Sequence, residues 1–209
     1  MFVRECVGVG RDPRMNLAGL TYHVWANGTS AQRILRDDID KDTLVRLLRE
    51  EVKRSNWICL AYVVMTTHYH VLLRLREATL SSGFQRFNLR YARYFNRRYA
   101  ARGHVFDAPF EHRIVEGRFD ELEVSRYLAL NPTKANMCSR PEDYQWSSYG
   151  ALIGEFIADG IVDERSALKP LGGSRDRYRM YVEARDARTR WDLIRTRSRA
   201  APSPPSSSR

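Results

Sequence analysis

Cysteine is scarce in this chain. The 209 residues include only three cysteines, Cys6, Cys59 and Cys138, which lie far apart and form no Cys-x-x-Cys pair. The sequence therefore has neither the cysteine spacing of a zinc site nor the even set of cysteines that marks a disulfide framework. Free cysteines of this kind are typical of a reducing compartment, so we expect a cytoplasmic protein.

Long apolar runs are lacking as well. No segment approaches the roughly 20 consecutive apolar residues that a membrane-spanning helix needs. The first residues, MFVRECVGVGRDPR, lack the apolar centre of a signal peptide. We also find no internal repeat. These absences favour one domain of ordinary size, with extensions and without a membrane partner.

Positive charge is abundant. There are 35 Lys and Arg residues against 25 Asp and Glu residues, which gives a formal net charge of +10. An excess of this size favours a polyanionic partner, of which nucleic acid is the commonest. A basic protein that is merely soluble has a similar composition, so charge alone does not decide. The apolar share of 43% is sufficient for a hydrophobic core.

The stretch from 57 to 76, WICLAYVVMTTHYHVLLRLR, organises the rest of the chain. Two apolar runs, 58–65 and 71–75, contain no Pro or Gly and are rich in Val, Ile, Leu and Tyr, which predicts two adjacent strands. Because strand side chains alternate between faces, His68 and His70 share one face with Leu72 and Arg74. The alternate residues form an apolar face for the core: Tyr69, Val71, Leu73 and Leu75. Two imidazoles at this spacing can reach one metal ion. Histidine pairs that only pack are common, so the motif needs support from elsewhere in the chain.

The same kinds of pattern predict the other elements. Strands are expected at 21–26 and 112–116, and helices from Asp40 or Asp42 to about 54, over 79–101 and over 121–131, with Pro132 closing the last helix. Segment 103–110 is expected to be a loop or a short strand, and the basic segment 174–199 a helix. The resulting strand–helix–strand–strand–helix–strand order favours an α+β fold.

The helix expected at 79–101 carries two rows of side chains. Its apolar row consists of Leu80, Phe84, Phe87, Tyr91, Tyr94 and Phe95, and its basic row of Arg86, Arg90, Arg93 and Arg97. The basic row lies about 200° around the helix from the apolar one and therefore faces away from the core. A solvated face would normally mix in Glu, and none occurs between residues 78 and 110. We interpret the four arginines as contacts to DNA phosphates.

Three further residues, Tyr127, Asn131 and His23, indicate no function when each is considered alone. Tyr127 and Asn131, four residues apart, share one row of the helix expected at 121–131. By itself Tyr127 is best interpreted as an ordinary half-buried aromatic. His23 alternates with aromatic and apolar neighbours in the first strand, and we interpret it as a packing or strand-edge group rather than as a metal ligand.

These pieces together resemble a known family. AYVVMTTHYHVLL resembles the HUH signature of the single-tyrosine transposases, in which two histidines on a strand flank a bulky apolar residue. RYLALNPTKANM followed by PEDYQWSSYGALIG resembles the Tyr-x-x-x-Asn-Pro and Trp-Ser-Ser-Tyr segments of the REP-associated tyrosine transposases within that family. TYHVWANG and GHVFDAPF fall in the expected order, and the resemblance covers roughly residues 15–155.

The chain departs from the family pattern in three places. Thr66-Thr67 stands where the family has Pro-Asn, Tyr69 stands where it has an aliphatic residue, and Asp107–Phe110 replaces its Gln-Gly-Arg-Phe segment. The candidate catalytic side chains are nevertheless all in place.

The resemblance implies a fold and a domain plan. The fold is α+β, a ferredoxin-like antiparallel sheet with packed helices, followed by a basic C-terminal helical extension. We expect an N-terminal extension at 1–16, the transposase domain at 17–155, the basic extension at 156–199 and a disordered Pro- and Ser-rich tail at 200–209.

The resemblance also implies a reaction. Tyr127 is the expected nucleophile, and His68, His70 and Asn131 are the expected ligands of Mg²⁺ or Mn²⁺. The expected enzyme is a metal-dependent transposase that cleaves and rejoins single-stranded DNA at hairpin-bearing, REP-like repeats through a 5′-phosphotyrosine intermediate. Such an enzyme is expected at the nucleoid, as a monomer or a homodimer.

Two other functions remain open at this point. The first is a non-catalytic, domesticated protein that kept the fold and binds DNA hairpins. The second is a zinc hydrolase that uses His68 and His70 with a third histidine, His104 or His112, although the spacing of these residues is unlike that of known zinc sites.

Overall fold

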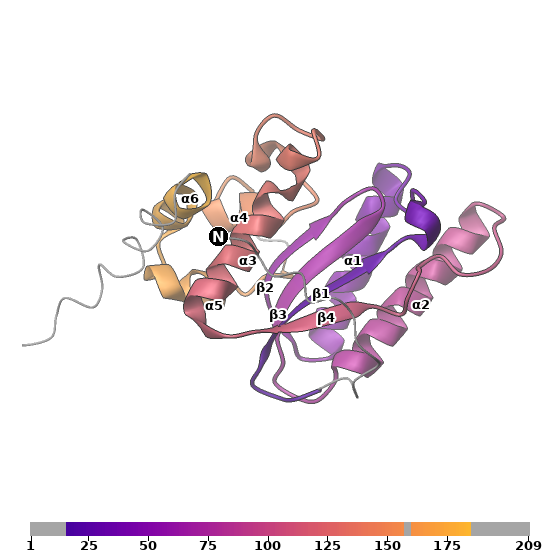
Figure 1. The fold of residues 1–209 in the computed structure, drawn as a ribbon, viewed down its shortest axis with the longest axis horizontal. Helices are drawn as coiled ribbons and strands as arrows, with labels where there is room; N and C mark the ends of the chain where they lie inside the picture. The colour runs from indigo at the N-terminus through magenta and orange to yellow at the C-terminus, as the bar shows by residue number, and fades with distance from the viewer. Residues whose placement is uncertain (1–15, 157–159, 185–209) are drawn as a thin grey trace, which may run out of the picture.

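The computed structural model describes residues 16–156 and 160–184. Its centre is a four-stranded antiparallel sheet in the order β2-β3-β1-β4 (Figure 1). The strands are β1 (Thr21–Asn27), β2 (Ile58–Val64), β3 (His68–Arg74) and β4 (Glu111–Val115). The expected pair of strands around the two histidines is therefore confirmed, as is the α+β class.

Helices cover both faces of the sheet. α1 (Asp38–Arg54) and α2 (Leu80–Arg98) lie on one face, and α3 (Gly117–Lys134) lies on the other (Figure 1). The apolar row of α2 is buried against α1 and the sheet, with Phe84, Phe87 and Tyr91 each at most 1% exposed. No helix in the described ranges is both long and apolar enough to cross a membrane.

Alternation along β3 divides the two layers as the sequence predicts. Tyr69, Val71 and Leu73 join the core with α1 and α2, whereas Leu72 joins the cluster formed with α3. The histidines at positions 68 and 70 share the face of Leu72 and hence point toward the α3 side.

The start of α1 differs from the expectation. The helix is capped by Asp37, whose side chain accepts a hydrogen bond from the backbone N–H of Asp40, and neither Asp40 nor Asp42 is the cap. Asp40 is instead fully buried, and its carboxylate is satisfied by hydrogen bonds from Arg98, Tyr94 and Tyr99. The sequence offers several acidic residues in a row, and only these tertiary contacts distinguish the cap from the buried carboxylate.

Pro132 does not close α3, contrary to expectation. The helix continues through it to Lys134, and Pro132 is buried within it. A proline in a last turn removes one intrahelical hydrogen bond, and its fixed φ is otherwise helical. Beyond it, the N–H of Ala135 still donates to the carbonyl of Asn131, which continues the helical pattern.

Three short helices follow, α4 (Tyr149–Ile153), α5 (Glu164–Leu168) and α6 (Arg175–Glu183), with 3₁₀ turns at Thr29–Ala31, Pro141–Asp143 and Lys169–Leu171. α4 and α6 share one hydrophobic cluster with α3, which includes Leu122, Tyr149 and Tyr178. α6 forms the start of the helix expected at 174–199 and ends at Glu183, where Ala184 adopts an extended backbone. Residues 185–199, the tail at 200–209 and residues 1–15 lie outside the described residues.

Candidate active site

Strand β3 and helix α3 bring the predicted nucleophile to the predicted histidines. The ring of Tyr127 meets the ring of His70 edge-on, with centroids 5.6 Å apart and planes at 78°. The rings of His68 and His70 have centroids 5.0 Å apart. Tyr127 remains 40% exposed, so its side chain is accessible from solvent although it contacts a buried histidine. Lys134, at the end of the same helix, places its Nζ 5.6 Å from the centre of the Tyr127 ring.

Both predicted ligand histidines have one ring nitrogen engaged. The Nδ1 of His68 lies 2.9 Å from the hydroxyl oxygen of Thr67, and the Nδ1 of His70 lies 3.1 Å from the Nε2 of His23. Within the described residues, neither Nε2 makes a hydrogen bond. Histidines that bind metals usually engage the second nitrogen in this way, which fixes the orientation of the ring.

Burial keeps these imidazoles neutral. It lowers the pKa of His70 to about 2, with smaller contributions from His23, His68 and Arg113, and it lowers the pKa of His68. Burial, followed by the charge of Arg113, lowers the pKa of His23 to about 3. A neutral imidazole offers the lone pair that a metal ion requires, so His68 and His70 fit the divalent ion implied by the family resemblance.

The structure limits which side chain could be the third protein ligand of a metal ion. No group of three or more His, Cys, Asp or Glu side chains in residues 16–156 and 160–184 is arranged to hold a metal ion. Hard ions such as Mg²⁺ and Mn²⁺ prefer oxygen ligands, which an amide side chain can supply. Asn131 lies one turn beyond Tyr127 on α3, and its Nδ2 is buried without a hydrogen-bond partner among the described residues. The role of Asn131 as a ligand stays a prediction.

The zinc hydrolase considered above is wrong. His112 lies on the opposite face of the sheet from His68 and His70, where its ring contacts Tyr22 with centroids 5.9 Å apart. His104 lines a hollow beside α2. Neither histidine joins the pair on β3, and this agrees with the absence of a three-ligand cluster from the described part of the chain.

His23, interpreted from the sequence as a packing or strand-edge group, packs against the site, and its contact with His70 was not predicted. It is 5% exposed, and its ring contacts His70, Trp25 and Tyr127 at centroid distances of 5.1, 5.0 and 6.2 Å. The signal was present in the predicted fold, because a ferredoxin-like order places the first strand beside the strand that carries His68 and His70. Only the register of the two strands, however, shows that His23 meets His70.

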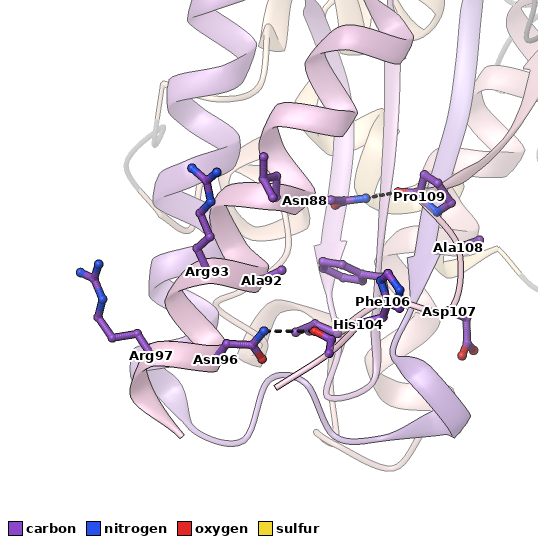
Figure 2. A pocket seen from close by; sticks show the side chains of 13 residues that line it. Asn88, Ala92, Arg93, Asn96, Arg97, His104, Phe106, Asp107, Ala108 and Pro109 are labelled. Atoms are coloured by element: carbon purple, nitrogen blue, oxygen red, sulfur yellow. Dashed lines mark hydrogen bonds between the residues drawn. The ribbon is translucent and has the colours of Figure 1, made fainter. Parts of the chain in front are cut away.

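The arginine row of α2 divides into two pairs. Arg86 donates to the buried carboxylate of Glu51 at 2.7 Å, and Arg90 donates to Glu50. Both are therefore paired with α1, although their side chains stay 40% and 38% exposed. Arg93 and Arg97 are exposed, and neither forms an ion pair with a described residue. They line a hollow of about 640 Å³ between α2 and the loop at 103–109 (Figure 2).

Two of the departures from the family pattern have visible consequences. Thr67 supplies the hydroxyl that engages His68. Asp107 accepts a hydrogen bond from the backbone N–H of Ser30, and Asn88 of α2 donates to the carbonyl of Pro109, so both contacts hold the loop that walls the hollow (Figure 2). Segment 103–110 is therefore a loop, joined to the end of β1 by a bridge between Gly28 and Phe106.

The fold and the site together define a ferredoxin-like α+β protein with a histidine pair facing a tyrosine. Comparison with known families then identifies the group: a model of the IS200-like transposases matches residues 16–131, more than half of the chain, and the protein belongs to this family. The family expected from the sequence motifs is thereby confirmed.

One solved structure supports the fold. The structure of a REP-associated tyrosine transposase bound to a REP hairpin is similar with a TM-score of 0.59 and 16% identity, over 73% of this chain and 93% of that chain. A protein of Deinococcus radiodurans R1 that is described as a transposase matches with a TM-score of 0.41 and 16% identity, over 56% of this chain and 95% of that one. No curated protein matches the sequence.

Proposed function

We propose that this protein is a single-stranded DNA transposase that cleaves and rejoins DNA beside hairpin-bearing repeats, with Tyr127 as its nucleophile. The observation that carries the proposal is the edge-on contact between Tyr127 and His70, at a centroid distance of 5.6 Å, in a side chain that is still 40% exposed. The tyrosine thus lies beside the histidine pair and remains accessible to a DNA strand.

In the proposed reaction, the phenolic oxygen of Tyr127 attacks the phosphorus of a DNA phosphodiester. The new oxygen–phosphorus bond forms as the bond to the 3′ oxygen breaks, and the phenolic proton passes, in the net reaction, to the departing 3′ oxygen. The products are a 5′-phosphotyrosine and a free 3′-hydroxyl. Attack by a 3′-hydroxyl on the phosphotyrosine is the reverse step and rejoins DNA without ATP.

His68, His70 and Asn131 are the residues that would hold Mg²⁺ or Mn²⁺. When bound, the ion supplies positive charge to the phosphate under attack. Two features support this assignment: the Nε2 atoms of both histidines are left without a partner in the described structure, and the amide of Asn131 is buried and unsatisfied. Asparagine oxygen and nitrogen are interchangeable by a flip of the amide, so the same side chain can present its oxygen.

The proposed partner is a DNA hairpin with unpaired flanking nucleotides. The similar REP-associated transposase was solved with a REP hairpin, and the net charge of +10 suits such a partner. Of the four arginines expected to contact phosphates, Arg93 and Arg97 are the stronger candidates because both are exposed and free of ion pairs with described residues. Arg86 and Arg90 already neutralise carboxylates of α1.

The hollow beside Arg93 and Arg97 suits an unpaired base. Its volume of about 640 Å³ lies in the usual range of small-ligand sites, and Leu89, which is 48% exposed, and Phe106 give it apolar walls. The loop at 103–109 connects it to the end of β1, where Asn27 pairs with His68.

A cleavage assay tests the proposal. Labelled single-stranded DNA carrying the hairpins that flank the gene is mixed with the protein in Mg²⁺, in Mn²⁺ or in EDTA. The expected result is a metal-dependent nick and a covalent protein–DNA adduct that Tyr127→Phe abolishes while hairpin binding is retained. Tight hairpin binding without a nick in either metal would contradict cleavage and favour the non-catalytic DNA-hairpin-binding protein.

A further inference from the structure

His70 is held in place by a second histidine from the neighbouring strand. The Nε2 of His23 on β1 lies 3.1 Å from the Nδ1 of His70. The register pairs Trp25 with His70 and His23 with Leu72, so His23 reaches His70 diagonally across the sheet face. The ring of His23 is also enclosed by Trp25 and Tyr127, which restricts its movement.

The chemistry of this contact depends on which ring carries the shared hydrogen. A neutral imidazole has one N–H and one nitrogen lone pair. If the Nδ1 of His70 carries the hydrogen and donates it, His23 accepts through Nε2, and the Nε2 of His70 keeps a lone pair for a metal ion. If His23 donates instead, the Nε2 of His70 carries a hydrogen and binds no metal ion.

We propose that His23 is a positioning residue that accepts a hydrogen bond from the Nδ1 of His70 and so holds the Nε2 lone pair of His70 open to a divalent cation. The inference rests on the proposed metal site. Thr67 engages the Nδ1 of His68 in the equivalent way, so each of the two histidines has its own partner. Partners of this kind contribute about 10- to 100-fold to metal affinity in other proteins.

A second observation allows the two histidines to change tautomer together. The Nδ1 of His23 is buried and has no hydrogen-bond partner among the described residues. Nothing there fixes the hydrogen of His23 on either of its nitrogens. Occupation of the Nε2 of His70 therefore sets the tautomer of both rings, and His23 responds to a cation that it does not touch.

Two variants of His23 and one control variant test whether His23 supports metal binding by His70. Their Mn²⁺ affinity is measured without DNA by electron paramagnetic resonance titration. His23→Phe keeps a planar ring but removes the acceptor, and we expect its affinity to fall about 10- to 100-fold. His23→Gln places an acceptor oxygen near the former Nε2, and we expect it to restore most of the affinity. His112→Phe makes the same change on the opposite face of the sheet and is expected to bind Mn²⁺ like the unaltered protein. Thermal unfolding of each variant confirms that it is folded.

Nitrogen-15 NMR of the unaltered protein provides a test that needs no variant. With Mg²⁺ bound, we expect hydrogen on the Nδ1 of both His23 and His70 and none on the Nε2 of His23. Hydrogen found on the Nε2 of His23 under these conditions would overturn the inference.

The other outcomes are equally decisive. Unchanged affinity in His23→Phe, or an equal loss in His23→Phe and His23→Gln, would overturn the inference, because the second result points to packing alone. If the variants show the expected order of affinities but the unaltered protein cuts no DNA, the inference stands and the proposed cleavage fails.

Discussion

The two faces of the sheet are both buried, yet they treat polar groups differently. On the face toward α1 and α2, the hydroxyl of Tyr69 donates to Asn88 and that of Tyr91 donates to the carbonyl of Ile34. On the side of α1 and α2, the Oε2 of Glu51 and the Nε of Arg86 are also buried without a partner among the residues described, but they belong to two side chains joined by an ion pair. On the face toward α3, the Nδ1 of His23 and the Nδ2 of Asn131 are buried without a partner in the described residues and lie at the candidate active site. Unpaired buried polar groups cost stability and call for an explanation, such as a bound ion or a chemical role. Both faces contribute to the core, and the face toward α3 also carries the unpaired groups of the reaction that we propose.

Replacing one tyrosine on each face with phenylalanine gives the largest expected difference in adduct formation. Tyr127→Phe removes the proposed nucleophile, and we expect the covalent adduct to fall by about a thousandfold or more. Tyr69→Phe removes one buried hydrogen bond and costs about 1 kcal/mol of stability, while the adduct still forms. Adduct yields on denaturing gels and urea unfolding measure the two effects. An adduct that persists in Tyr127→Phe would assign the nucleophile to another residue.

The next contrast is between two buried residues of β3 that point to opposite faces. Leu73→Ala opens a cavity in the core with α1 and α2 and is expected to cost about 2–5 kcal/mol of unfolding free energy. His70→Ala is expected to lower the rate of metal-dependent cleavage on the order of a hundredfold. Its effect on urea unfolding is expected to be the smaller of the two. Equal losses of cleavage in the two variants would mean that the faces are not separate in function.

The arginines of α2 allow a similar comparison between residues that are free for DNA and a residue that stabilises the fold. Arg93→Ala with Arg97→Ala is expected to weaken hairpin binding and to reduce the slope of log affinity against log salt by about 1 per arginine removed. Arg86→Ala leaves the carboxylate of Glu51, which is 1% exposed, with only the hydroxyl of Ser55 as partner. We expect this variant to lose about 1–3 kcal/mol of stability and to keep the salt slope. Fluorescence anisotropy at several salt concentrations, together with thermal unfolding, separates the two results.

The smallest expected effect concerns adjacent threonines before β3. Thr67→Val removes the hydroxyl that engages His68 and is expected to lower Mn²⁺ affinity about tenfold. Thr66→Val makes the same change one residue earlier, where the side chain has no such contact, and is expected to leave the affinity unchanged. Isothermal titration of Mn²⁺ into each variant decides whether the position of the hydroxyl matters.

Local periodicity in the sequence predicts which face a residue occupies, but not what lies opposite it. It placed His68 and His70 together and assigned the buried row of α2 correctly, because alternation and helical spacing are properties of one element. It did not reveal that Arg86 meets Glu51, because that contact joins two helices. It missed His23 for the same reason, since a hydrogen bond between β1 and β3 depends on strand register.

The segment after α3 closes one side of the sheet. The N–H of Val64 donates to the carbonyl of Trp146, the N–H of Ser148 donates to the carbonyl of Tyr62, and Asp163 donates to Cys59. These backbone hydrogen bonds cover the outer edge of β2 with a later segment of the same chain. The covered edge cannot pair with a strand of another molecule. Within the described sheet, this leaves β4 as the edge at which two copies of the protein would form a continuous sheet. In any homodimer of that kind the two α3 helices, which carry Tyr127 and pack on β2 and β3, would lie far apart at the two ends of the joined sheet.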